Sequence, residues 1–319
     1  MSVMKAAIVS EFCRPPALGE FEIPEAREDE VIVSVEAAAL SQLVRLQASG
    51  KHYSSGQPPF VPGADGVGRL QNGQRVYFAF PRAPVGAMAE QVAVKRTHIV
   101  ELPHKLDGVT AAAIANPGMS SWAALVSQCR FRADETVLIN GATGASGKLA
   151  ISIARHLGAA RVIATGRNPD HREAMLALGA DDYLLTTDGA RFEQQLKGEF
   201  ERGVDVVLDY LWGAPAEAIL QAATGKGPGN PERRIRFVNI GALGGLNITL
   251  PAAVVRSSRL EIIGSGLGSV HMADLIQAIA GVMQAVDNAG LSIDTHAVNI
   301  DHVEEAWSTS FPGRTVFTI

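Results

Sequence analysis

Glycines dominate the segment of this chain whose residue types and spacing most clearly suggest chemistry. The segment Asn140–Lys148 reads NGATGASGK and places Gly141, Gly144 and Gly147 three residues apart. A short apolar stretch, TVLIN, comes before it, and apolar residues at near-helical spacing follow it. Glycines between a strand and a helix let a pyrophosphate approach backbone N–H groups at the positive end of the helix. The pattern therefore predicts a dinucleotide-binding loop, with an ordinary glycine turn as the alternative.

The residues after the next apolar stretch indicate which dinucleotide binds. About 20 residues beyond the glycines, dinucleotide-binding folds normally place an acidic residue that binds the ribose 2′-OH. Here RVIAT is followed by Gly166 and Arg167, and the acid is absent. The planar guanidinium of Arg167 suits a 2′-phosphate, and such a charged hydrogen bond contributes about 1.5–3 kcal/mol. We therefore predict NADPH rather than NADH, with Arg172 and His171 as weaker second contacts. The alternative is that Arg167 is a solvated surface residue.

The first third of the chain, which precedes these residues, consists of short β-rich stretches. Pro-Pro, Pro-Gly and Asn-Gly turn signals separate them at irregular spacing, which is typical of a barrel-like β domain. The stretches are 5–9, 31–37, 74–80 and 89–94.

From about residue 110 the pattern changes to apolar strands that alternate with helices. The strands are 136–140, 161–165, 204–209, 236–240 and 260–264, and the helical stretches are 148–157, 171–178 and 272–288. Uninterrupted apolar strands indicate a parallel sheet covered on both faces. The tail from His296 is β-rich again. The predicted fold class is therefore α/β. A β-barrel-type domain at 1–112, completed by 290–319, accompanies a Rossmann doubly wound parallel sheet at 113–289.

Composition excludes several classes of protein. The 319 residues are 47% hydrophobic and 19% charged, which is too apolar for a disordered chain. The net charge is −5 and no basic run stands out, which argues against nucleic acid or an anionic membrane as partner. Two cysteines, Cys13 and Cys129, cannot form a disulfide framework. The chain has no signal-peptide pattern and no apolar run of about 18 residues, so we expect a cytoplasmic protein.

Taken in order, several segments resemble the medium-chain dehydrogenase/reductase superfamily, specifically its zinc-free quinone oxidoreductase branch. The resemblance covers nearly the whole chain, and its segments are specific in this order although each is common alone. They are Met4–Val9, Glu30–Ala37, Pro59–Gly68, Asn140–Gly147, Asp205–Asp209, Val238–Gly241 and Gly313–Val316. Membership implies a GroES-like β domain beside a Rossmann domain, with the active site in the cleft between them.

The resemblance also implies that no metal is bound. Zinc-dependent relatives place Cys where this chain has Ser41, a His-Glu pair at Ala64 and Asp65, and a third ligand near Pro117. A catalytic zinc needs about three protein ligands, and these residues do not supply them. Without a Lewis acid, the family chemistry that fits is hydride transfer from NADPH to a quinone or to an α,β-unsaturated carbonyl.

Two residues are the predicted catalytic groups by the same resemblance. The stretch SGKHY (49–53) resembles the family's active-site segment, in which a tyrosine lies near the nicotinamide. Tyr53 would donate a hydrogen bond to the substrate oxygen, with His52 as the alternate donor and a packed loop tyrosine as the alternative. Ser41 stands where an asparagine is frequent, and either contacts the nicotinamide or ends a loop. Another tyrosine frequent in quinone reductases is Leu46 here.

The remaining predicted cofactor residues follow late strands or precede a helix. Asn116, Met119 and Ser120 resemble the stretch that meets the nicotinamide ring, although Ser120 or Ser121 could instead be helix N-caps. The full set of predicted cofactor residues is Asn116, Gly141, Thr143, Gly144, Ala145, Ser146, Gly147, Gly166, Arg167, Arg172, Gly241, Ala242, Leu243, Ser265, Gly266 and Leu267.

The sequence therefore predicts an NADPH-dependent, zinc-independent reductase of quinones or α,β-unsaturated carbonyls. The alternatives are a trans-2-enoyl thioester reductase of the same superfamily and a non-catalytic NADPH-binding redox sensor. The apolar strand around 259–263 would lie at a sheet edge, where unpaired backbone groups favour a homodimer. A helix beginning near His271 could instead cover that edge.

Overall fold

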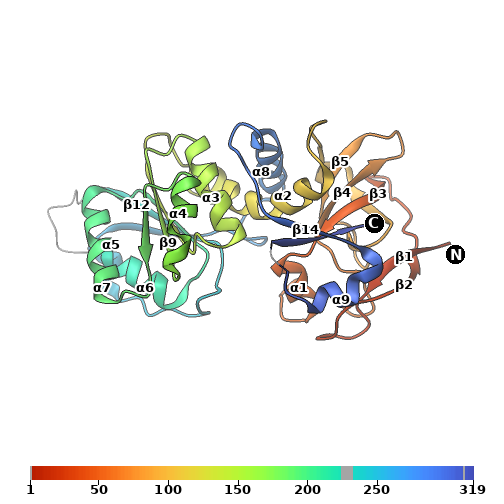
Figure 1. The fold of residues 1–319 in the computed structure, drawn as a ribbon, viewed down its shortest axis with the longest axis horizontal. Helices are drawn as coiled ribbons and strands as arrows, with labels where there is room; N and C mark the ends of the chain where they lie inside the picture. The colour runs from red at the N-terminus through yellow and green to blue at the C-terminus, as the bar shows by residue number, and fades with distance from the viewer. Residues whose placement is uncertain (1, 224–232, 312) are drawn as a thin grey trace. The chain divides into compact units, whose positions relative to one another are not determined.

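The computed structural model describes residues 2–223, 233–311 and 313–319, which fall into two compact units. The first unit is Met1–Asn116 with Ser292–Ile319, and the second is Pro117–Leu291. In Figure 1 the red-to-orange start of the chain and its blue end lie in the same unit. The domain bounds expected from the sequence, 1–112 with 290–319 and 113–289, differ from these by a few residues. Each unit is described by itself below.

The first unit is built on a seven-stranded, mostly antiparallel sheet. Its strands follow the order β14-β15-β3-β4-β5-β7, and β6 pairs with β3 off that path. Their bounds are β3 Glu30–Ala39, β4 Asp65–Leu70, β5 Arg75–Ala79, β6 Gln91–Lys95, β7 Ile99–Glu101, β14 Thr295–Asn299 and β15 Arg314–Thr318. A separate ribbon pairs β1 (Val3–Ile8) with β2 (Ala17–Glu22). The late strand β15 pairs antiparallel with β3, which returns the end of the chain to its first part.

One apolar core holds the first unit together. It contains Val33 and Phe78 from the sheet, Met88 from the loop before β6, and Trp307 and Phe317 from the end of the chain. Three helices accompany the strands: α1 (Gln42–Ala48), α9 (Val303–Ser308) and part of α2 (Gly108–Ala123).

The second unit contains a six-stranded parallel sheet in the order β10-β9-β8-β11-β12-β13. Its strands are β8 Thr136–Asn140, β9 Arg161–Gly166, β10 Asp182–Leu185, β11 Val206–Asp209, β12 Arg234–Asn239 and β13 Arg259–Gly264. Uninterrupted apolar runs form β8, β9 and β11, and these strands are almost completely buried. The chain order reverses between the neighbours β8 and β11, which makes the carboxyl ends of these two strands the topological switch point of the sheet.

Helices connect the parallel strands. They are α3 Ala145–His156, α4 Arg172–Ala177, α5 Ala190–Arg202, α6 Gly213–Ala222 and α7 Ala252–Arg256, and a further helix, α8 Met272–Ala285, follows the last strand of this sheet. The helix expected at 148–157 begins three residues earlier, so its first turn includes the last glycine of the loop. The sequence pattern did not predict β10 or α5. Among the described residues, no helix is both long enough and apolar enough to cross a membrane.

Candidate functional site

The glycine loop joins β8 to α3 and leaves the first turn of that helix open. Gly147 lies so close to the start of the loop that a Cβ there would be 2.5 Å from the Gly141 carbonyl oxygen. At Gly144 a Cβ would meet only that same oxygen, at 3.9 Å. Gly144 is the N-cap of α3, and no side chain caps the helix. The N–H groups of the first turn are therefore left without a side-chain cap, and helix polarity favours an anion there.

At the end of the neighbouring strand β9, Gly166 is required by a packed tyrosine. A Cβ on Gly166 would lie 2.1 Å from the Tyr183 hydroxyl oxygen, and that hydroxyl donates a 2.8 Å hydrogen bond to the Asn168 carbonyl. Burial raises the pKa of Tyr183, so its hydroxyl keeps its proton for this bond. The Thr186 hydroxyl donates to the Gly166 carbonyl at 3.3 Å. These bonds hold the backbone on which the next residue, Arg167, is displayed.

The two arginines predicted near the 2′-phosphate differ in how they are held. Arg167 is exposed, and its guanidinium has no ion pair with any residue that the structure describes. Arg172 is bound to β10: it donates to the Tyr183 carbonyl at 2.9 Å and to the Asp182 carboxylate at 3.1 Å. A guanidinium engaged in this way is less available to a ligand, which leaves Arg167 as the freer cation.

A row of polar side chains crosses the carboxyl ends of four adjacent parallel strands. Thr165 on β9 donates to the Asn140 side-chain oxygen at 2.9 Å, and the Asn140 amide donates to Asp209 at 2.8 Å. Asn239 on β12 donates to the other oxygen of Asp209 at 3.2 Å. Burial raises the pKa of the Asp209 carboxyl, and its hydrogen bonds oppose that rise. Sequence reasoning missed Asp209 and Asn239 as site residues, although a polar residue ending each apolar strand was the available signal.

The late loops lie at the same edge of the sheet. Gly241, Ala242 and Leu243 follow β12, and the Leu243 side chain is 76% exposed. After β13, Ser265 is buried and its N–H donates to the Asn239 carbonyl at 2.8 Å, while Gly266 and Leu267 continue the turn. Since carboxyl ends of parallel strands share one edge, these loops lie on the same side of the sheet as the glycine loop.

Helix α2 differs from what the sequence suggested for its serines. Ser120 and Ser121 lie inside the helix and donate to the Pro117 carbonyl at 2.8 and 3.3 Å, so the prediction that one of them is an N-cap is wrong. Ser121 also contacts the Tyr210 hydroxyl at 2.7 Å and the Ser146 carbonyl at 3.2 Å, at the start of α3. Asn116, in the first unit, acts as a hydrogen-bond partner of the Asp65 carboxyl.

The two predicted catalytic residues lie at either end of helix α1, in the first unit. Ser41 is buried and caps α1, where its hydroxyl accepts the Val44 N–H at 3.2 Å. Tyr53 is 77% exposed, in the turn after the helix, and its ring lies 4.2 Å from that of His52. His52 in turn contacts the Ser54 hydroxyl at 2.7 Å. Tyr53 is thus free to meet a ligand, whereas Ser41 has a structural role as a cap.

The residues at the positions of zinc ligands do not fit a zinc site. Ser41 uses its hydroxyl as a helix cap, and Asp65 accepts a 2.7 Å hydrogen bond from buried Tyr77. Burial raises the pKa of Asp65, which weakens it as an anionic ligand. Within the described residues, no group of three or more His, Cys, Asp or Glu side chains could hold a metal ion.

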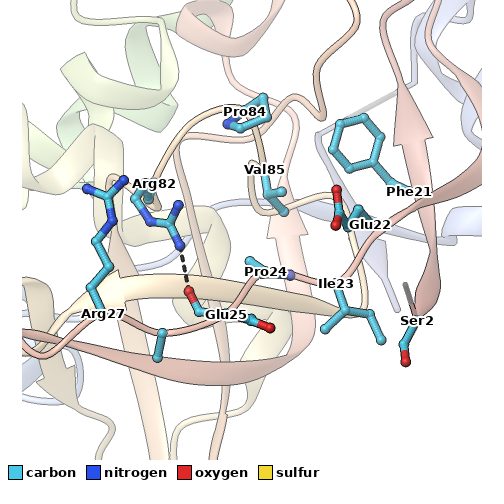
Figure 2. Close-up of a pocket in the computed structure, with 11 residues that line it drawn as sticks. Ser2, Phe21, Glu22, Ile23, Pro24, Glu25, Arg27, Arg82, Pro84 and Val85 are labelled. Atoms are coloured by element: carbon cyan, nitrogen blue, oxygen red, sulfur yellow. Dashed lines mark hydrogen bonds between the residues drawn. The ribbon is translucent and has the colours of Figure 1, made fainter.

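A surface pocket of about 600 Å³ occurs in the first unit, and no predicted site residue lines it. Segment 21–27 lines most of it, together with Arg82, Pro84 and Val85, as Figure 2 shows. Arg82 donates to the Glu25 carbonyl at 2.6 Å, and its guanidinium also pairs with buried Glu30. None of the lining residues belongs to the predicted cofactor or catalytic set.

Comparison with known proteins places the chain among oxidoreductases. The profile of the family described as "Zinc-binding dehydrogenase" matches residues 145–284. The chain is 29% identical to a probable NADPH-dependent quinone reductase of Emericella nidulans, with 88% of this chain and 89% of that protein covered. It is 26% identical to the quinone oxidoreductase of Rattus norvegicus, with 89% and 86% covered.

Solved structures agree with this grouping. The quinone oxidoreductase of Thermus thermophilus, solved alone and in complex with NADPH, is 27% identical. It superposes with a TM-score of 0.80, over 99% of this chain and all of that one. A putative NADPH:quinone reductase of Bacillus thuringiensis has a TM-score of 0.84 at 20% identity, with 100% of both chains covered, which shows a shared fold.

Proposed function

Because the chain belongs to the medium-chain dehydrogenase/reductase superfamily and is quinone oxidoreductase-like, we propose that it reduces quinones or α,β-unsaturated carbonyls without zinc. It is an oxidoreductase of the NADPH-dependent quinone reductase type, and NADPH is its cofactor. The observation that carries the proposal is the open, uncapped first turn of α3 at the switch point of the sheet, with Arg167 beyond the adjacent strand.

The residues of the second unit fit NADPH. The uncapped N–H groups of Ala145, Ser146 and Gly147 suit a diphosphate, because the space next to Gly144 is free of side chains. Thr143 lies in the same loop, and the backbones of Gly241–Leu243 and Ser265–Leu267 are available at the same edge. Arg167 suits the 2′-phosphate because its exposed guanidinium has no ion pair among the described residues. When bound, NADPH supplies a hydride.

The remaining task for the protein is to stabilise the charge that develops on the substrate oxygen. The exposed hydroxyl of Tyr53 can donate a hydrogen bond to that oxygen, with His52 as the alternate donor. Burial lowers the pKa of His52, which favours its neutral form near neutral pH. Solvent can then deliver the proton. Zinc independence is supported by the roles of Ser41 and Asp65 in capping and in the hydrogen bond with Tyr77.

A thioester-reductase function is less well supported. It requires a basic path for the phosphates of coenzyme A or a carrier, and the candidate cations for such a path are Arg45, Lys51 and Arg82. Arg45 donates to the Trp307 carbonyl at 2.6 Å and stacks on that ring, and Arg82 pairs with Glu30. Two of the three cations are thus engaged inside the first unit.

The decisive experiment is NADPH oxidation by the purified protein against a panel of a quinone, an enone and an enoyl thioester, with and without a metal chelator. We expect turnover of the quinone or the enone that the chelator leaves unchanged. Turnover of the enoyl thioester alone would identify the thioester reductase. Tight NADPH binding with no turnover would identify a redox sensor, and activity restored only by zinc would contradict zinc independence.

We further propose that the protein forms a homodimer through β13. This strand is an edge of the six-stranded sheet, and Ile262 on it is 42% exposed, so helix α8 does not cover that position. A sheet continued across a twofold axis would pair the unused backbone groups of the edge. We also propose that the protein acts in the cytoplasm.

A further inference from the structure

The buried carboxylate of Asp209 is surrounded by donors. Its Oδ1 accepts from the Asn140 amide at 2.8 Å and from the backbone N–H of Leu211 at 3.1 Å. Its Oδ2 accepts from the Asn239 amide at 3.2 Å, and the Trp212 N–H lies 3.1 Å from both oxygens. An ionised carboxylate only accepts hydrogen bonds, so it satisfies all four groups at once.

The direction of every bond in this network is determined by its members. The Gly141 N–H donates to the Thr165 hydroxyl at 3.2 Å, and that hydroxyl donates its own proton to the Asn140 side-chain oxygen, which can only accept. The Asn140 amide then donates to Asp209. On the other side, Asn239 uses its amide for Asp209 and for the Gly241 carbonyl, at 2.9 Å. The network therefore runs from the glycine loop to the loop after β12, and Asp209 is its common acceptor.

The carboxylate also holds an unusual turn. Trp212 has φ 55° and ψ −160°, a backbone conformation that bulky residues avoid and that persists only where the surroundings impose it. The bonds from the Trp212 and Leu211 N–H groups to Asp209 are such a restraint. The Trp212 ring packs edge-on against Phe237, 6.1 Å away, which fixes the other end of the residue.

This turn packs between the two loops that the network joins. A Cβ on Gly141 would lie 2.9 Å from the Leu211 side chain, so the glycine loop rests directly on the turn. The Gly244 N–H donates to the Leu211 carbonyl at 2.6 Å, and a Cβ on Gly213 would lie 2.5 Å from the Gly244 carbonyl oxygen. Any shift of the 210–213 turn would therefore move both loops.

We propose that Asp209 is a positioning residue for cofactor binding: its carboxylate locks the 210–213 turn, and through it the glycine loop and the loop after β12, in the arrangement that receives the dinucleotide. This rests on the proposed function, because the two loops are the ones assigned to NADPH. Asp209 itself need not touch the cofactor. Because both loops serve the part common to NADPH and NADH, its loss should weaken both dinucleotides alike.

The test is direct titration of NADPH and NADH by fluorescence with Asp209→Asn. The variant keeps the shape of the side chain but turns an NH₂ group toward at least two N–H donors, whichever way the amide lies. We expect both dissociation constants to rise by about tenfold, with their ratio unchanged, since hydrogen bonds to the charged carboxylate are lost and the same two loops serve both dinucleotides. In turnover, the KM for NADPH should rise by more than kcat falls.

Asp205→Asn is the matched control. Asp205 immediately precedes β11, at the end opposite Asp209, where its carboxylate accepts the Thr136 N–H at 2.9 Å and pairs with Arg233. The Asp205→Asn variant carries the same isosteric change, but at a carboxylate with no hydrogen bond to either loop. Its affinities for NADPH and NADH should therefore match those of the wild type. Equal losses in both variants would overturn the proposal, because they would reflect general destabilisation.

A second variant keeps the proposal testable if Asp209→Asn does not fold. Asn239→Ala removes one donor to the carboxylate and one bond to Gly241, and it too should weaken both dinucleotides together. If Asp209→Asn folds and binds both dinucleotides as tightly as the wild type, the proposal is overturned. If Asp209→Asn does not fold, wild-type affinities in Asn239→Ala overturn it. A wild-type protein that binds neither dinucleotide would instead refute the proposed function.

Discussion

Two exposed side chains are the ones most directly responsible for ligand recognition in the proposed function. Arg167 follows β9 on a backbone held by the Tyr183 and Thr186 hydroxyls. Tyr53 lies in the turn after α1, with its side chain 77% exposed. Surface substitutions away from the core usually change stability by no more than about 0.5 kcal/mol. Their effects on ligand binding and turnover can therefore be measured in a folded protein.

Arg167→Ala should remove most of the preference for NADPH. We expect its dissociation constant for NADPH to rise by about tenfold to a hundredfold, because a charged hydrogen bond to the 2′-phosphate is lost. Affinity for NADH should change little. Fluorescence titration checks this, with Arg132→Ala as control, since Arg132 is an exposed arginine just before β8, at the opposite end of the strands. Equal binding of the two dinucleotides by the wild type would refute the assignment.

Tyr53→Phe tests the hydrogen-bond donor. If the hydroxyl stabilises charge on the substrate oxygen, kcat should fall by about tenfold to a hundredfold, while NADPH affinity stays the same. The measurement is steady-state turnover with a quinone and with an enone. His52→Ala is the companion variant, since the two rings lie 4.2 Å apart. Unchanged kcat in Tyr53→Phe with both substrates would exclude the tyrosine.

At the scale of elements, the connection from β8 to α3 separates glycines needed for packing from those that leave room for a ligand. Gly147 lies against the backbone of Gly141 and Ala142, at 2.5 and 2.6 Å from the position of an added Cβ. Gly144 has φ −75°, which any residue adopts, and open space beside it. A glycine is therefore needed at 147 because the backbone packs closely there, whereas the glycine at 144 leaves space for a ligand.

A pair of alanine variants should separate these two roles. Gly147→Ala forces a backbone shift, and we expect the free energy of unfolding to fall by about 1–3 kcal/mol. Gly144→Ala changes an N-cap and should cost no more than about 1 kcal/mol. Its added methyl group nevertheless occupies the space proposed for the diphosphate, so NADPH affinity should fall. Thermal unfolding without cofactor, followed by NADPH titration, measures both effects. An unchanged NADPH affinity in Gly144→Ala would show that the diphosphate does not bind beside Gly144.

At the scale of the whole molecule, the open edge of the parallel sheet is the feature with consequences for assembly. Among the described strands, β13 pairs only with β12. The Ser265 N–H donates to the Asn239 carbonyl on β12, and N–H groups alternate sides along a strand. The N–H groups of Ile263 and Glu261 therefore face β12, whereas that of Ile262 faces outward. A second copy of the chain could pair with this outward side.

Ile262→Pro should convert the dimer to a monomer. Proline removes an outward N–H and leaves the inward ladder of β13 intact, so the subunit should still fold. Light scattering should show a dimer for the wild type and a monomer for the variant. Leu246→Ala, which changes a side chain that is 83% exposed and lies outside the strand, should remain dimeric. A wild-type protein that is monomeric at micromolar concentration would end the proposal.

The sequence alone determined the features that depend on neighbouring residues. Apolar runs and turn residues predicted the parallel strands β8, β9 and β11 and the helix after the glycines, because periodicity and glycine spacing act over a few residues. The ordered family segments predicted the superfamily and the cofactor. The absent acid and the presence of Arg167 likewise needed no tertiary information.

Only the tertiary structure decided how distant residues meet. Asp209 bonds to Asn140, 69 residues away, and to Asn239, 30 residues away, and no local pattern records such a pairing. The same holds for Tyr183, which explains Gly166, and for Asp182, which engages Arg172. Ser120 and Ser121 proved to be inside α2 because the helix begins twelve residues before Ser120, at Gly108. The physical reason is that parallel strands join residues far apart in sequence, so the polar row at their ends exists only once the sheet has formed.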